Sequence, residues 1–232
     1  MIPKFLELGY LSFVVAGIPL LSWRTMRNRA VRSAPRTALY ASAVISQWIA
    51  AGLGIAVVFT AGISFSRLYF HSPRAQDFAL WTLAVAAASL AIEGFFLWAE
   101  RRGWWPQESD LMLLLLPGTR REMGWALLVL SPTAAICEEF IYRGFAVSEL
   151  HAFLGSTVAA VAIATVAFGL AHCYQGWAGM FRAAVLGLLL AWPVIHLGSL
   201  YPAMAAHWII DAAGFAWLGP VHSRTRTRIP EV

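Results

Sequence analysis

The sequence predicts an all-α fold, a polytopic transmembrane helical bundle of about seven spans, and three observations support this prediction. Hydrophobic residues make up 59% of the chain and charged residues only 12%, whereas a soluble domain carries about 25% charged residues. Apolar runs of about 20 residues, the length that crosses a hydrocarbon core about 30 Å thick, recur along the chain. Arginines gather between these runs, next to their ends, as they do in membrane proteins.

The apolar runs give the expected spans in order: 5–22, 38–62, 78–99, 122–148, 155–174, 179–197 and 199–217. The first run is expected to be a retained span rather than a cleaved signal peptide, because Glu7 interrupts its start and no small-residue cleavage site follows. Residues 111–116 are apolar but too short to span, so we expect them at the membrane interface or as a cap on the bundle. The last two spans are separated by little more than a turn.

Loop charges predict the orientation of these spans. With seven spans, thirteen arginines fall on one side, whereas the other side receives only Lys4, Arg67 and Arg74. The positive-inside rule then places the N-terminus outside and the C-terminus in the cytoplasm. The many Ala, Arg and Trp residues favour a bacterial protein, hence the inner membrane. Topology and anionic lipid headgroups explain the net charge of +5, so the lipid bilayer is an expected partner and nucleic acid is not.

Two adjacent carboxylates, Glu138 and Glu139, stand inside the fourth apolar run together with Arg143. A charge near the bilayer centre costs about 2.5–3.5 kcal/mol on insertion scales, and each apolar neighbour returns only about 0.3–0.6 kcal/mol. Glu139 and Arg143 are four residues apart, so they can pair on one helix face. Glu138 points about 100° away and is free to face a cavity. The pair therefore predicts a functional site.

Two further spans carry polar residues at helical spacing. Phe168 and His172 are four residues apart, as are His207 and Asp211, and such faces converge only in the interior of a bundle. A carboxylate beside an imidazole can activate water, and a second imidazole can stabilise an oxyanion. The same three groups, Glu138, His172 and His207, can instead ligate zinc. His172 is expected nearer the membrane surface than Glu138, so tilt, a kink or a shifted helix start must bring them level.

The three motifs together resemble the CPBP family of intramembrane proteases, which includes the type II CAAX prenyl endopeptidases and the bacterial Abi proteins. Residues 138–143 match EExxxR, residues 168–172 match FxxxH, and residues 207–211 approach HxxxN. The resemblance covers about 121–217. It implies Glu138 as general base acting with His172, His207 as oxyanion stabiliser, and Glu139, Arg143 and Phe168 as supporting residues.

The chain departs from the family at Asp211, where the prenyl endopeptidases carry Asn. We therefore expect Asp211 to be neutral, or to orient His207 or a metal. The family is often described as metalloproteases, although a metal-independent glutamate mechanism is favoured for the prenyl endopeptidases. The resemblance thus leaves two alternatives, no cofactor or a divalent metal such as zinc bound by Glu138, His172 and His207.

The predicted organisation has three parts: residues 1–120 with three spans and the interfacial connection, the catalytic core 121–217, and a basic cytoplasmic tail 218–232. The expected function is hydrolysis of a peptide bond in a membrane-embedded or lipidated protein or peptide. An inactive family member serving as a membrane scaffold or bacteriocin-immunity protein is the first alternative, and a proton-coupled transporter is the second. Glu93, isolated in the third span, is expected to be structural, with His196 as a candidate partner.

Overall fold

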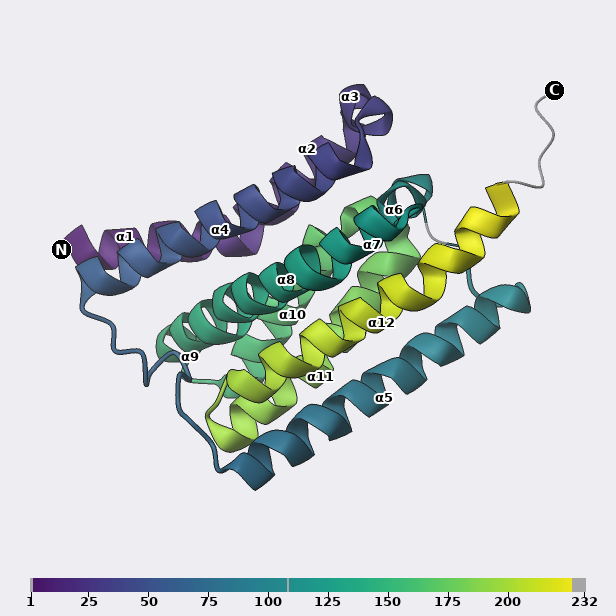
Figure 1. Cartoon of the computed structure of the whole chain (residues 1–232). Helices are drawn as coiled ribbons and strands as arrows, with labels where there is room; N and C mark the ends of the chain where they lie inside the picture. Colours follow the sequence, from purple (N-terminus) through teal and green to yellow (C-terminus); the bar gives the residue numbers. More distant parts are fainter. Residues whose placement is uncertain (1, 108, 227–232) are drawn as a thin grey trace.

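The computed structural model describes the backbone of residues 2–107 and 109–226 and the side chains of residues 4–107 and 109–217. Within these ranges the chain forms only helices, turns and loops, arranged as a helical bundle (Figure 1), so the predicted all-α fold is confirmed. Residues 227–232 of the predicted basic tail, and all of that tail's side chains, lie outside the described residues.

The N-terminal half contributes two long helices and several shorter segments. They are α1 (Ile2–Ser12), the π-helical η1 (Phe13–Gly17), α2 (Ile18–Arg27), α3 (Arg29–Ser33), α4 (Arg36–Ala61) and α5 (Ala75–Arg101). Helix α4 begins directly after Pro35, which has extended dihedral angles, and ends at Gly62, whose φ of +67° disfavours other residues.

The C-terminal half contains one long interrupted helix followed by an antiparallel series. Its elements are α6 (Asp110–Leu115), α7 (Arg120–Trp125), the π-helical η2 (Ala126–Leu130), α8 (Ser131–Glu138), the π-helical η3 (Glu139–Ala146), α9 (Val147–Leu154), α10 (Thr157–Ala171), the 3₁₀ turn η4 (Cys173–Gln175), α11 (Gly176–Leu197) and α12 (Tyr201–Arg226). A capping box between Thr119 and Glu122 starts α7. Gly155, with a φ of +68°, makes the turn between α9 and α10.

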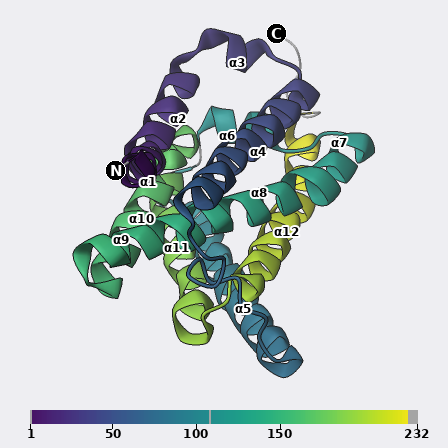
Figure 2. The ribbon, with the colours of Figure 1, turned by 90° about the vertical axis from the view of Figure 1, so that its left-hand side faces the viewer.

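Helix α8 lies at the centre of the bundle, where it contacts both α4 and α12 (Figure 2). Helix α5 packs along α12, and α10 packs along α11. Helices α10 and α11 approach closely at Gly169, where a Cβ would lie only 2.9 Å from the backbone oxygen of Met180. The carboxylates of α8 and η3 are therefore enclosed by helices from both halves of the chain.

Five helices of the described residues are long and apolar enough to cross a membrane: Lys4–Arg27, Arg36–Ala61, Ala75–Arg101, Arg120–Leu154 and Cys173–Leu197. The predicted count of seven is not confirmed. The segment predicted at 155–174 forms a helix of only 15 residues, Thr157–Ala171, about 22 Å long. Most of the segment predicted at 199–217 lies in α12, which begins at Tyr201 and is not among the five.

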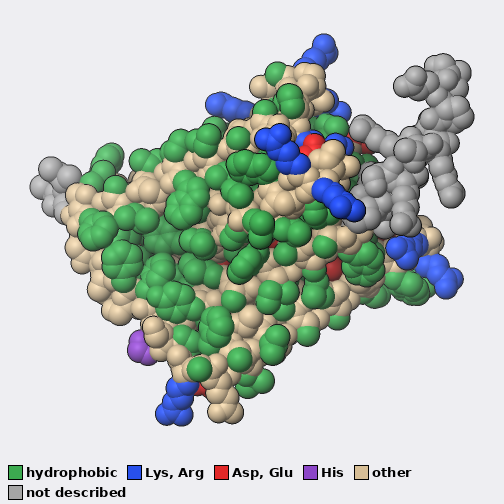
Figure 3. Space-filling view, in the orientation of Figure 1, with side chains coloured by type: hydrophobic (Ala, Val, Ile, Leu, Met, Phe, Trp, Pro, Cys, Tyr) green, Lys and Arg blue, Asp and Glu red, His purple; other side chains and the backbone are tan. Residues whose placement is uncertain are grey.

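The surface agrees with a membrane protein. Hydrophobic side chains cover the flank of the bundle, whereas Lys and Arg gather mostly at the end where α3 and α7 lie (Figure 3). Large apolar side chains on this surface are strongly exposed, among them Phe59 at 70% and Leu128 at 72%. Lipid is the environment that solvates such a surface.

Candidate active site

The helical hairpin formed by α9 and α10 brings Glu138 and His172 to the same depth. Both residues lie seventeen positions from Gly155, one before the turn and one after it. The two arms of the hairpin bring the side chains together, and Oε2 of Glu138 lies 3.9 Å from Nε2 of His172. The expected mismatch in depth is resolved by shifted helix boundaries, because the first helix continues to Leu154 and the second begins at Thr157.

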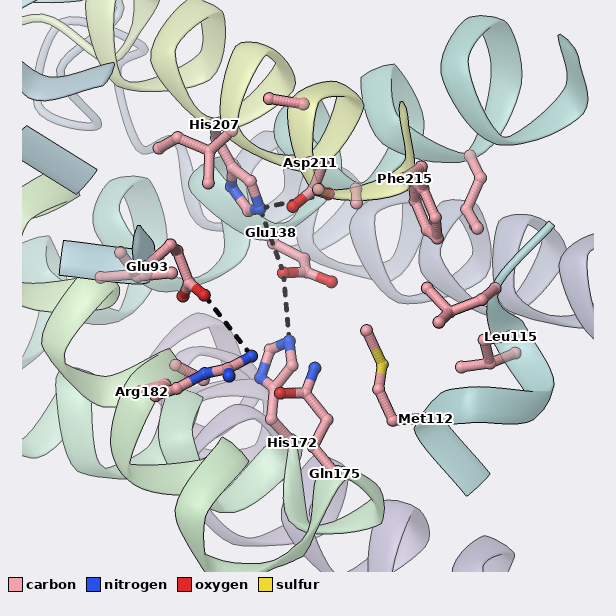
Figure 4. Close-up of a pocket in the computed structure, with 18 of the residues that line it drawn as sticks. Glu93, Met112, Leu115, Glu138, His172, Gln175, Arg182, His207, Asp211 and Phe215 are labelled. Atoms are coloured by element: carbon pink, nitrogen blue, oxygen red, sulfur yellow. Dashed lines mark ion pairs between the residues drawn. The ribbon is translucent and has the colours of Figure 1, made fainter. Parts of the chain in front are cut away.

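Glu138, the last residue of α8, presents its two carboxylate oxygens to different partners. Oε1 accepts a hydrogen bond from Nε2 of Gln47 at 2.7 Å. Oε2 lies 3.9 Å from Nε2 of His172 and 4.0 Å from Nε2 of His207 (Figure 4). It is buried and has no direct hydrogen-bond partner among the described residues. One oxygen is therefore held while the other faces two imidazoles.

The hydrogen bond of His172 defines its tautomer. Nδ1 lies 2.8 Å from the backbone oxygen of Phe168, and because a carbonyl oxygen only accepts, Nδ1 carries the proton. In the neutral ring Nε2 is then an acceptor, and it points toward Glu138. The Phe168 ring packs against the imidazole with centroids 4.5 Å apart, which fixes its plane.

Glu139 links η3 to α12 and is fully buried. Its Oε1 accepts from Nη1 of Arg143 at 2.8 Å and from Nδ1 of His207 at 2.8 Å. The predicted pairing of Glu139 with Arg143 is thus present. The Arg143 guanidinium also lies 4.2 Å from the centroid of the Phe168 ring, within cation–π range. This network joins the three motifs and orients His207, whose Nε2 is left facing Glu138.

Asp211 stands one helical turn after His207 on α12. Its Oδ2 lies 3.7 Å from Nε2 of His207, and the side chain is about one-third exposed (31%). This position places a carboxylate beside the imidazole and at the edge of the pocket. The geometry favours an orienting or electrostatic action on His207.

Glu138, His172, His207 and Asp211 line one pocket of about 230 Å³, and its remaining walls are mostly apolar. Met112, Leu115 and Phe215 lie across from the imidazoles in Figure 4. Residues 111–116, which were predicted to lie at the membrane interface or to cap the bundle, therefore form a wall of the pocket. Helix α6 is held there because Tyr40 donates to the backbone oxygen of Leu115 at 2.7 Å.

An ion-pair cluster forms another wall of the pocket. Arg182 of α11 lies 3.5 Å from Glu93 and 3.1 Å from Glu100, both on α5. Glu93 thus pairs with Arg182, and the prediction of His196 as its partner is wrong. His196 instead stacks on Trp192 and Trp81, with ring centroids 4.7 and 5.6 Å away.

The donor set does not fit a metal ion in this arrangement. Two ligands about 2.1 Å from a tetrahedral zinc lie about 3.4 Å apart, whereas Oε2 of Glu138 is 3.9 and 4.0 Å from the two imidazole nitrogens. Among the described residues no group of three or more His, Cys, Asp or Glu side chains is placed to hold a metal.

Gln47 is the site residue that sequence reasoning missed. It lies in the second apolar run, outside every recognised motif, and its contact with Glu138 joins residues 91 positions apart. The available indication was an amide near the middle of an apolar helix. Such a group is costly to bury without a hydrogen-bond partner.

Comparison with known proteins agrees with this class of site, a buried glutamate–histidine cluster in a helical membrane bundle. Residues 120–213 match the family described as type II CAAX prenyl endopeptidase Rce1-like. This segment is therefore similar to the Rce1-like family, in agreement with the resemblance found in the three motifs, and the match supports an intramembrane endopeptidase at the level of the family. The comparisons with curated proteins and with solved structures gave no match.

Gly187 of α11 tests how tightly the network is packed. A Cβ added there would lie 2.8 Å from Nη2 of Arg143 and 2.9 Å from Cδ1 of Phe168. We expect Gly187→Ala to destabilise the protein by about 1–3 kcal/mol, because both side chains must move in a filled interior. Thermal unfolding in detergent measures this. Gly94→Ala in α5 is the control, since its Cβ meets nothing within 4 Å; equal melting of the two variants would contradict the packing.

Proposed function

We propose that this protein is an intramembrane endopeptidase in which Glu138 and His172 activate a water molecule. The observation that carries the proposal is the position of Glu138 Oε2, which lies 3.9 Å from Nε2 of His172 and 4.0 Å from Nε2 of His207. Two atoms that each lie about 2.8 Å from a water oxygen are about 4 Å apart when the angle at the water is near 90°. One water can therefore bond to Glu138 and to either imidazole.

The tautomer of His172 supports water activation. Nε2 of neutral His172 and Oε2 of ionised Glu138 both accept, so both protons of a shared water point toward them. The lone pairs of the water oxygen then face away from the two bases, toward the pocket. As the water attacks a peptide carbonyl, Glu138 takes one proton, and it returns this proton to the nitrogen of the leaving amine when the C–N bond breaks.

His207 supplies the donor for the developing oxyanion. Its Nδ1 proton is held by Glu139, so donation from Nε2 requires the imidazolium form. Three carboxylates, Glu138, Glu139 and Asp211, lie within 4.0 Å of the ring nitrogens, and they stabilise that cation. In this mechanism Asp211, which stands where the prenyl endopeptidases carry Asn, contributes by stabilising the positive charge of His207.

The pocket favours a hydrophobic peptide that reaches the site from the membrane. Its walls carry Met112, Leu115 and Phe215 on one side of the carboxylate, and the helices around it carry exposed apolar side chains suited to lipid. The substrate proposed here is a membrane-embedded or lipidated protein or peptide. We further propose a bacterial inner-membrane location with the N-terminus outside and the C-terminus in the cytoplasm.

Reconstitution in proteoliposomes tests the proposed activity. The probes are a farnesylated peptide with a CAAX ending and an unprenylated peptide with a hydrophobic C-terminal segment, both analysed by mass spectrometry. We expect a single internal cleavage in at least one probe by the wild-type protein and none by Glu138→Gln. Intact probes with the wild type, or identical cleavage by both proteins, would overturn the proposal.

Removal of metal provides an independent prediction. Because the donor set does not fit a metal ion, we expect the cleavage rate to be unchanged after dialysis against a strong chelator followed by chelator-free assay. The metal content of the purified protein is measured in parallel. Loss of activity that zinc restores would contradict the metal-independent mechanism and leave the cleavage itself established.

A further inference from the structure

We propose that Gln47 is a positioning residue for the general base: its amide holds Oε1 of Glu138 so that Oε2 faces the two imidazoles. This inference rests on the proposed function, because it assigns Gln47 a role in the same reaction. Gln47 lies on α4, outside the segment 120–213 that matches the family. The N-terminal half would then contribute to the reaction by positioning the base through this residue.

The geometry of the contact carries the proposal. Nε2 of Gln47 lies 2.7 Å from Oε1 of Glu138, a short distance for an N–H donor and typical of a charged acceptor. A carboxylate has two equivalent oxygens, and a rotation about its last bond exchanges them. A donor on one oxygen instead restrains the plane of the carboxylate, so that the other oxygen is held 3.9 and 4.0 Å from the imidazole nitrogens.

A packing role alone does not account for this amide. The carbonyl oxygen of Gln47 is buried and has no hydrogen-bond partner among the described residues. Buried polar atoms are nearly always paired, since an unpaired one costs about 1–3 kcal/mol. An apolar side chain would fill the same space without this cost, so the contact with Glu138 is the feature of Gln47 that requires an amide.

Gln47 differs from its neighbours on α4 in the direction of its side chain. Trp48 and Ile49 are strongly exposed on the surface of the bundle, at 47% and 59%, whereas Gln47 turns inward and lines the pocket with Glu138, His172 and His207. Helix α4 contacts α8 directly. The helix therefore presents a hydrogen-bond donor to Oε1, the oxygen of the base that does not face the histidines.

Three variants separate positioning from packing. Gln47→Met keeps the length of the side chain and removes the donor, and we expect kcat to fall about 10–100-fold while KM changes less than threefold. Gln47→Glu offers a donor only when its new carboxyl is protonated, so its activity relative to wild type should rise as the pH falls. Ser46→Ala, an exposed change on the same helix, is the control and should leave kcat unchanged.

A double-mutant cycle tests the contact without an activity assay. Thermal unfolding in detergent is measured for wild type, Gln47→Met, Glu138→Met, which removes the acceptor, and the double variant. We expect the two changes to be non-additive because the residues share a hydrogen bond. Additive effects would overturn the contact, and an unchanged kcat in Gln47→Met would overturn the positioning role. Failure of the wild type to cleave any probe would instead contradict the proposed function, and the cycle would still report on the contact.

Discussion

Glu138→Gln is expected to lower kcat by about 10²–10⁴-fold, the contribution of a positioned general base, while leaving the fold intact. The amide has the size of the carboxylate, and its oxygen still accepts from Gln47, whose donor lies 2.7 Å away. What the amide lacks is an oxygen able to take a proton from water beside His172. Initial rates on the cleaved peptide in proteoliposomes measure the effect.

Glu149→Gln provides the matched control, because it makes the same change on the same interrupted helix. Glu149 is buried but pairs with Arg67 at 3.0 Å and does not line the pocket. We expect its rate to stay within twofold of wild type. A comparable loss in both variants would indicate a general effect of removing buried charge and would remove Glu138 as the base.

Arg143→Met is expected to destabilise the protein by about 3–5 kcal/mol, because it leaves Glu139 buried without its guanidinium partner. The two side chains are 3% and 0% exposed and are joined at 2.8 Å. The change also removes the cation–π contact with Phe168. Thermal unfolding in detergent should show a large fall in the melting temperature together with loss of activity.

Two further variants serve as controls for Arg143→Met. Arg29→Met makes the same change at an exposed position, and we expect it to change stability by only about 0–0.5 kcal/mol. Adding Glu139→Gln to Arg143→Met removes both buried charges, so stability should partly return. Activity should not return, because in the double variant His207 has lost its carboxylate acceptor. Wild-type melting of Arg143→Met would contradict the buried ion pair.

Local spacing was sufficient to predict part of the site. The separation of four residues between Glu139 and Arg143 defines one face of a helix, and the structure contains that pair at 2.8 Å. Composition and hydropathy likewise predicted helices throughout, because a chain in lipid must satisfy its backbone groups internally. The roles of Glu138, His172, His207 and Asp211, and the division of the chain at residues 120 and 217, stay predictions.

Contacts between distant helices were not predictable in the same way. Gln47 contacts Glu138, and Arg182 contacts Glu93, from different helices. The spacing of residues within one helix does not show which helices pack against each other. The span count also depended on where the turns fall, because a helix must be long enough as well as apolar enough to cross a membrane. The turn at Gly155 leaves α10 with only 15 residues, fewer than the roughly 17–25 residues that a transmembrane helix needs.

The most direct test of the central claim follows the oxygen of water in a single turnover of the wild-type protein in H₂¹⁸O. Direct attack by a water that Glu138 has activated predicts that every new C-terminal carboxyl carries one ¹⁸O and that the peptide containing Glu138 carries none. Label in the carboxyl of Glu138, or a product without label, would show that a protein oxygen attacks the substrate and would contradict the account.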